Sequence, residues 1–314
     1  MAVGLAAFGA QAGDYHPPRT AWGAPDLGGL WSNNSLTGLE RDPAFKALAP
    51  TAAEGQAYEA KHLGKPPVFD RTSTVGGPES EWWDRDIGLA RIRGQLRTSW
   101  IVSPADGQLP YTAAAKAFHQ ARRQSRREAI DDPESRDLAE RCMDPSSIGP
   151  PMVNGGVNDN YQFVQTRDAV AIHAEWDHDV RVIRIDPAGR HPPPTVRRWM
   201  GDSIGHWEGD TLVVETTNFT AHEIDAPRQN ATDDMRVVER FTRSSAGEIF
   251  YEFSVTAPAV FLQTWRGEMV FHATRGPIYE FACHEGNYAL QNMLLGARHA
   301  ETRPPNPSTT ASAK

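Results

Sequence analysis

The segment from His173 to Arg181 holds the densest group of residues that could perform chemistry. It reads His-Ala-Glu-Trp-Asp-His-Asp-Val-Arg, with two imidazoles and three carboxylates within seven residues. A histidine beside a carboxylate is a common arrangement for a positioned general base or for a metal ligand. The segment contains neither HExxH nor His-x-His, so its spacing does not favour a metal. A solvated polar turn between two strands would have the same composition.

If this segment is catalytic, His178 or Glu175 would move the proton, and Arg181 would hold an oxyanion or a carboxylate. Asp179 completes the candidate catalytic residues of this segment.

A second polar segment lies near the C-terminus, at residues 283–288. Adjacent side chains on a strand point apart, and catalytic Cys and His normally come from distant segments, so we do not expect a thiol nucleophile. We expect a polar loop that covers the mouth of a barrel; a structural loop held by hydrogen bonds is the alternative. Its candidate catalytic residues are His284 and Glu285, which we expect near the first segment at the barrel mouth, and its candidate ligand-binding residues are Asn287 and Tyr288. A weaker alternative is a metal site formed by His173, His178 and His284.

The sequence Gly201-Asp202-Ser203-Ile204-Gly205 matches G-x-S-x-G, the pattern around the nucleophile of many serine hydrolases. That nucleophile needs a strand, a sharp turn and then a helix. A hairpin strand follows Gly205, so the context fails. We expect a turn in which Asp202 and Ser203 bond their own backbone.

The stretch His206–Phe219 predicts a β-hairpin. Gly209-Asp210 separates an aromatic-ended run from an alternating run, which is typical of a two-residue hairpin turn. Together with the C-terminal segment YEFACHEGNY at 279–288, this hairpin resembles a family of bacterial secreted proteins. In that family a WEGDTLVVETTNF-like hairpin and an ACHEGNY-like loop recur in the same order. The resemblance implies secretion but no particular activity.

The resemblance extends to both cysteines, because Cys142 and Cys283 match cysteines of the family. In an oxidising compartment such a pair could form a disulfide. Two buried small hydrophobic side chains are the alternative. The family pattern is also matched by Glu175, His178, Asp179 and Arg181, whereas His173 departs from it by one place.

Short runs rich in β-branched and aromatic residues follow one another from residue 161, separated by turn signals. Because no helical pattern separates them, we predict a mainly β protein whose antiparallel meander closes into a lipocalin-like β-barrel over 155–298. A strand ending at Trp31 would join or plug this barrel. The runs are Tyr161–Gln165, Val170–Trp176, Val180–Ile185, Val196–Met200, His206–Glu208, Thr211–Phe219, Met235–Arg243, Ile249–Thr256, Thr264–Ala273 and Ile278–Ala282.

Alternation along these strands groups residues by face, but it does not decide which face lines the barrel. Glu239, Glu252 and Glu268 lie on three such faces, the last together with Arg266 and His272. If all these faces point inward, they surround a polar cavity; if they point outward, a dry aromatic core fills the barrel. The candidate ligand-binding residues are Trp176, Trp199, Trp207, Glu215, Glu239, Tyr251, Asn287 and Tyr288.

Residues 13–154 are loop-rich, and we expect them to wrap the barrel. Helices are predicted at Ala52–Leu63, from Thr112 to about Ile130, and at Glu134–Arg141. Residues 1–12 end in Ala-Gln-Ala and resemble the remnant of a signal peptide. The tail at 299–314 is rich in Pro, Ser and Thr and is expected to be disordered.

The composition narrows the class of function. The net charge of −8 argues against nucleic acid as a partner, and no apolar run is long enough to span a bilayer. Neither a P-loop nor a CxxC is present, and we expect no cofactor. We therefore expect a secreted or periplasmic, cofactor-independent enzyme that acts on a small organic molecule as an isomerase, lyase or hydrolase. A non-catalytic binding barrel for an aromatic or terpenoid-like ligand is the alternative, and a metal-dependent hydrolase is a weaker one.

Overall fold

The computed structural model describes residues 15–63, 87–128, 132–136, 138, 140–143, 149–221 and 232–302. The expected signal-peptide remnant at 1–12 lies outside these residues, as does most of the expected disordered tail. The boundary of that tail is wrong, because the last helix, α4 (Tyr288–Glu301), extends past residue 299.

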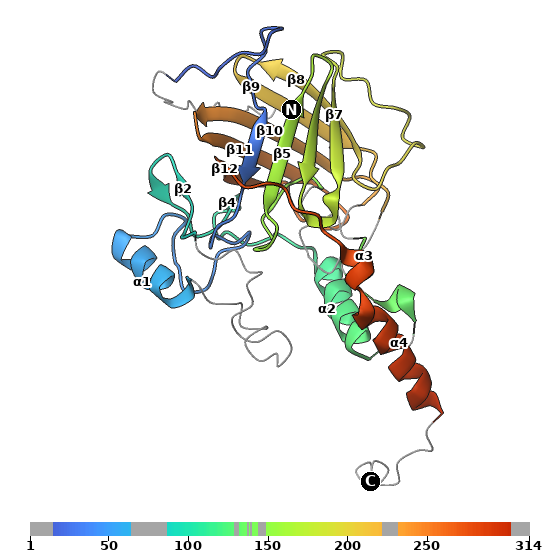
Figure 1. Cartoon of the computed structure of the whole chain (residues 1–314). Coiled ribbons are helices and arrows are strands. Elements are labelled where there is room, and N and C mark those ends of the chain that lie inside the picture. Colours follow the sequence, from blue (N-terminus) through green and yellow to red (C-terminus); the bar gives the residue numbers. More distant parts are fainter. Residues whose placement is uncertain are drawn as a thin grey trace.

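A closed barrel of nine strands forms the centre of the molecule and confirms the predicted fold class (Figure 1). The ring closes where the first strand pairs with the last, so it has no open edge. A further short strand, β4 (Ile101–Ser103), pairs with β12 beside the ring. In order around the barrel the strands are β1 (Gly29–Ser32), β5 (Asn160–Gln165), β6 (Ala169–Ala174), β7 (Val180–Ile185), β8 (Asp202–Glu208), β9 (Thr211–Thr217), β10 (Arg236–Ser245), β11 (Glu248–Thr256) and β12 (Trp265–Ala273).

One strand pair departs from the antiparallel meander, because β7 and β8 run parallel. Two parallel neighbours cannot be joined by a tight turn, so residues 186–201 must cross back to the end of the barrel at which β7 begins. The strand predicted at Val196–Met200 lies in this crossover and is wrong. Only Arg198 forms an isolated bridge there, with Phe219. The strand predicted at Ile278–Ala282 is also absent from the described segment.

The hairpin predicted around Gly209-Asp210 is confirmed. Strands β8 and β9 pair in register up to Glu208 and Thr211, which leaves a two-residue turn. Gly209 adopts a φ of 60°, a conformation that glycine reaches without strain. This turn fixes which side chains of β9 face inward.

Aromatic rings fill much of the barrel. Neighbouring ring centroids lie 4.8–6.0 Å apart, the spacing of well-packed aromatic pairs. These rings are buried and belong to one continuous core. They are Tyr161, Phe163, Phe241, Tyr251 and Phe271.

The polar strand faces do not line up inside the barrel. Glu239 pairs with Phe253, so it points inward with the aromatic residues. Glu252 and Glu268 pair with each other on the outer face. Burial raises the pKa of Glu252, and the charge of Glu268 opposite adds to this shift. The interior therefore combines an aromatic core with a single inward-facing carboxylate on β10.

The helices predicted in the N-terminal part are largely confirmed. Helix α1 (Ala52–His62) begins with a capping box between Thr51 and Glu54. Helix α2 (Ala113–Glu128) begins after Thr112, whose hydroxyl accepts the N–H of Ala115. The stretch from residue 87 forms a small hairpin, β2 (Arg91–Ile92) and β3 (Gln95–Leu96), and then β4.

One predicted helix is wrong, and the C-terminal part of the chain is helical where a barrel reaching residue 298 and a polar loop were predicted. The helix expected at Glu134–Arg141 is a single 3₁₀ turn, Pro133–Ser135, in the described residues. The C-terminal segment forms α3 (Cys283–Gly286) and α4, which gather with α2 beyond one end of the barrel (Figure 1). Within the described part of the chain, no helix is long and apolar enough to cross a membrane.

Candidate functional site

Arg181 and Glu239 form an ion pair inside the barrel, with side chains that are 2% and 0% exposed. Arg181 Nη1 donates to Glu239 Oε1 at 2.9 Å, and Nη2 donates to Oε2. The Tyr251 hydroxyl donates to the same Oε1 at 2.7 Å and accepts the N–H of Met152 at 3.0 Å. Buried charges are tolerated only when they are paired and hydrogen-bonded, and these groups meet both conditions.

The electrostatics of this pair favour a structural role. Burial by itself lowers the pKa of Arg181, but the carboxylate of Glu239 outweighs it, so the pKa is raised. Burial raises the pKa of Tyr251 well above its usual value, and Glu239 adds to the shift. Arg181 therefore stays charged and Tyr251 stays neutral at ordinary pH. Their hydrogen bonds are used within the protein rather than offered to a ligand.

Ser203 belongs to the same interior network. Arg181 Nε donates to Ser203 Oγ at 3.1 Å, and Nη2 donates to Thr216 Oγ1 at 3.0 Å. The turn predicted at Gly201–Gly205 is wrong, because Asp202 to Gly205 are the first residues of β8. The buried serine thus supports Arg181 and is not placed as a nucleophile.

Glu175 follows β6 and is buried at one end of the barrel. Its carboxylate accepts hydrogen bonds from Asn158 Nδ2 at 2.7 Å and from Asn160 Nδ2 at 3.3 Å. A third donor is the backbone N–H of Tyr279, at 3.3 Å. Glu175 therefore joins the His173–Arg181 segment to the start of the YEFACHEGNY segment at 279–288.

His178 ends the 3₁₀ turn that follows Glu175, and it also contacts the C-terminal segment. Its Nδ1 lies 3.1 Å from the carbonyl oxygen of Phe281, and the ring of Trp176 packs at 5.0 Å from that of Phe281. Asp177 and His178 have positive φ values of 52° and 45°, which are strained for these residues. Burial raises the pKa of Asp179, although the neighbouring His178 opposes the shift.

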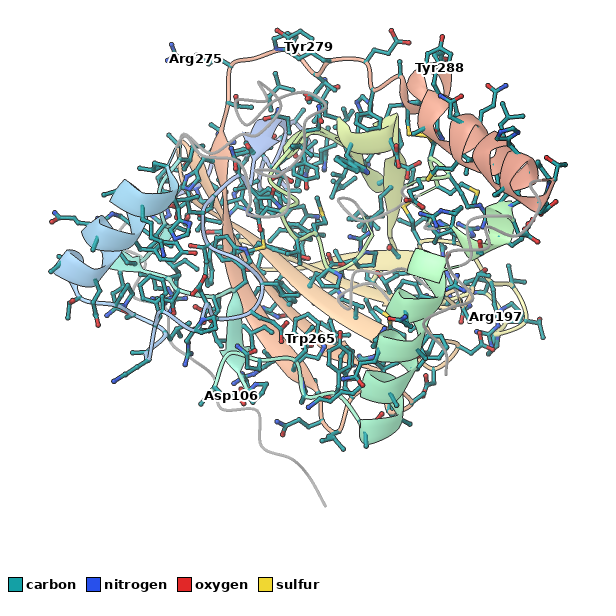
Figure 2. All side chains as sticks on the ribbon, turned by 90° about the horizontal axis from the view of Figure 1, so that it is seen from below. Asp106, Arg197, Trp265, Arg275, Tyr279 and Tyr288 are labelled. Atoms are coloured by element: carbon teal, nitrogen blue, oxygen red, sulfur yellow. A yellow bond between two sulfur atoms is a disulfide. The ribbon has the colours of Figure 1, made fainter. Side chains whose placement is uncertain are left out.

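The remaining C-terminal candidates serve the chain locally. Cys283 is bonded to Cys142, so neither sulfur is available as a nucleophile. Asn287 caps α4 by accepting the N–H of Leu290, and it donates to the carbonyl of Glu140 at 2.7 Å. Figure 2 shows Tyr279 and Tyr288 at the outer edge of the molecule, where both rings are largely exposed. His284 and Glu285 are exposed on α3.

The alternative metal site is not formed, because no cluster of three or more His, Cys, Asp or Glu suited to a metal occurs among the described residues. His173 alternates with inward-facing Ile172 and Ala174 and so lies on the outer face of β6, apart from the interior network. Trp207 packs against the rim of the core, and Trp199 is exposed in the crossover.

A histidine–carboxylate pair that the sequence analysis missed lies outside the barrel wall. His191 Nδ1 is 2.8 Å from Asp202 Oδ2, and the two side chains are 16% and 1% exposed. A carboxylate accepts hydrogen bonds, so in neutral His191 the proton is on Nδ1 and the lone pair is on Nε2. Nε2 lies 3.5 Å from Glu215 Oε1, beyond an ordinary hydrogen bond. We call this pair the His191–Asp202 dyad.

The local sequence explains how the dyad is held. Gly201 has a φ of 72°, and a Cβ there would lie 2.7 Å from the side chain of Thr216, so glycine is needed just before Asp202. Asn218, itself at a positive φ, donates to the carbonyl of Pro192 at 3.0 Å. This bond fixes the backbone directly after His191. The crossover is thereby held against the end of β9.

Only a weak signal in the sequence points to the dyad. His191 and Asp202 are eleven positions apart, at the two sides of a proline-rich stretch that resembles an ordinary loop. Their contact depends on the parallel crossover, which the strand pattern does not reveal. Glu215 was singled out as a ligand-binding candidate, and it does lie beside His191.

No family model, curated protein or solved structure matches this chain. The fold therefore defines a class, a nine-stranded mixed barrel with a crossover between β7 and β8.

Proposed function

We propose that this protein is a cofactor-independent enzyme that acts on a small organic molecule by acid–base chemistry at the His191–Asp202 dyad. The observation that carries the proposal is the 2.8 Å contact between Nδ1 and a carboxylate that is 1% exposed. Such a carboxylate holds the imidazole in one tautomer and stabilises the imidazolium formed when a proton arrives. His191 is the proposed catalytic residue, and Asp202 is the proposed positioning residue.

The proposed reaction begins with removal of a substrate proton by Nε2 of His191. Isomerisation, elimination and hydrolysis all use such a step, so the dyad supports this group of reactions and not one member of it. The carboxylate of Glu215, 3.5 Å from Nε2, is placed to favour the imidazolium while the proton is held there.

His178 supports the same class of function less well. Its Nδ1 is held by a backbone carbonyl, which fixes the tautomer but carries no charge to balance an imidazolium. Glu175 beside it already accepts three hydrogen bonds from the protein, so its carboxylate is engaged within the fold. We therefore place the proposed base at His191.

The proposed location is the periplasm or the extracellular space. The Cys142–Cys283 disulfide supports it, because such bonds persist mainly in oxidising compartments. The proposed partner is a small molecule, and the net charge of −8 makes nucleic acid a poor one.

The test uses 5-nitrobenzisoxazole, which opens to a coloured phenolate when a base removes its carbon-bound proton. We expect His191→Ala to lower kcat/KM by about 10²- to 10⁴-fold, because the positioned base is lost. The initial rate of phenolate release measures the effect. Equal rates for the wild type and His191→Ala would contradict the proposal.

A matched control separates this effect from the loss of any imidazole. His206 also lies near a carboxylate, with Nε2 3.2 Å from Glu208, but both side chains are about half exposed. His206→Ala should therefore keep the rate within about twofold, since an exposed imidazole lacks fixed orientation.

A further inference from the structure

Three arginines surround the carboxylates next to His191. Arg184 Nη2 donates to Asp202 Oδ2 at 2.9 Å, and Arg198 Nη1 lies 3.6 Å from Asp202 Oδ1. Arg236 pairs with Glu215 through two of its nitrogens. We call Arg184, Arg198 and Arg236 the arginine cluster. Its members come from β7, from the crossover and from β10, so the fold and not the sequence brings them together.

The charges of this region do not cancel. Three guanidinium groups face the two carboxylates of Asp202 and Glu215, which leaves one positive charge in excess while His191 is neutral. Protonation of His191 adds a second excess positive charge. The whole chain carries a net charge of −8, so the excess is local and opposite in sign to the net charge of the chain. Such a patch attracts anions of small size.

Arg198 has hydrogen-bonding capacity to spare. Its guanidinium contacts Asp202 only through the 3.6 Å ion pair, it donates no hydrogen bond to any described residue, and its side chain is 60% exposed. Its backbone is nevertheless fixed, because its N–H donates to Asn218 and its carbonyl accepts the N–H of Thr220. Arg198 therefore presents guanidinium N–H donors from a backbone position that is held by hydrogen bonds. This arrangement is suited to binding a carboxylate or a phosphate.

From these observations we propose that the substrate carries a carboxylate or phosphate group, which binds to the guanidinium of Arg198. This inference deepens the proposed function and rests on it for the statement that the bound anion is a substrate. The anion would occupy the side of Asp202 opposite His191, since Arg198 faces Oδ1 and His191 contacts Oδ2. Held there, it would bring the rest of the molecule next to the dyad.

Calorimetric titration with inorganic phosphate and, separately, with malonate tests the proposal. The titrations are made at about 10 mM ionic strength, where charges are little screened. We expect the wild type to bind at least one of the two anions, and Arg198→Gln to weaken that binding about tenfold or more. The anion that binds more tightly identifies the chemical group as phosphate or carboxylate.

Arg190→Gln is the matched control. Arg190 lies in the same crossover, but it is 79% exposed and pairs with Asp186 outside the arginine cluster. This variant removes the same charge and should bind the anion within about twofold of the wild type. Failure of the wild type to bind either anion would overturn the proposal, and so would an equal weakening in both variants.

The same samples separate this inference from the proposed function. His191→Ala should still bind the anion but lose activity with 5-nitrobenzisoxazole. If Arg198→Gln loses binding while His191→Ala stays active, the anion site holds and the assignment of the base is wrong. If His191→Ala is inactive and Arg198→Gln binds as the wild type does, the base holds and the anion site is wrong.

Discussion

Replacing Glu239 by glutamine should lower the free energy of unfolding by about 3–5 kcal/mol. The substitution keeps the shape of the side chain and removes only its charge, so Arg181 is left as an unpaired cation inside the barrel. The Tyr251 hydroxyl, which donates to Glu239 Oε1, keeps an acceptor in the glutamine amide. Urea denaturation followed by tryptophan fluorescence measures the change.

Two comparisons make this prediction specific. Glu208→Gln breaks the ion pair with Arg240 on the outer face, where the side chains are 50% and 39% exposed, and should change stability by no more than about 1 kcal/mol. The double variant Arg181→Met/Glu239→Gln removes the unpaired charge and should recover part of the loss. A Glu239→Gln variant as stable as Glu208→Gln would show that the interior pair does not hold the barrel together.

Removing the disulfide with Cys142→Ser/Cys283→Ser should lower the free energy of unfolding by up to about 5 kcal/mol. The bonded residues are 141 positions apart, and a loop of this length loses much conformational entropy when its ends are joined in the unfolded chain. The bond also ties α3 to the segment after the 3₁₀ turn. Urea denaturation of the oxidised wild type and of the double variant measures the difference.

Reduction provides the control for this second prediction. The chain has two cysteines and both are in the bond, so dithiothreitol should weaken the wild type and leave the double variant unchanged. Equal stability of the oxidised wild type and the double variant would mean that the bond constrains only the C-terminal segment and not the barrel.

Much of the barrel follows from local sequence. The alternating run after Gly209-Asp210 needs only a tight turn and one buried face, and both are local properties. The strand Val180–Ile185 is found with the predicted bounds. The crossover after β7 could not be predicted in the same way, because parallel pairing is a choice among distant partners that strand composition does not encode.

The sequence likewise could not predict which strand faces line the barrel interior. Alternation correctly places Glu239 with Phe241, and Glu252 with Phe250, on shared faces. It cannot say that the first face is inside and the second outside, because this depends on the pairing of Glu239 with Phe253 across β10 and β11.

The candidate site was predictable only in part. Glu175 and His178 contact the C-terminal segment through Tyr279 and Phe281, whereas the sequence pointed to His284 and Glu285. Arg181, in contrast, lies inside the barrel with Glu239 and not beside them. His191 was missed because its partner Asp202 is reached through the crossover, and a single histidine before a proline run has no recognisable spacing.

The most direct test of the central claim is the long-range ¹H–¹⁵N NMR spectrum of the His191 imidazole, recorded at about pH 8.5, where an ordinary imidazole is neutral. We expect Nδ1 to carry the proton and Nε2 to be free. In Asp202→Asn this preference should be lost together with most of the activity. A wild-type His191 protonated on Nε2 would contradict it, because the lone pair would then face Asp202 and no base would be available to a substrate.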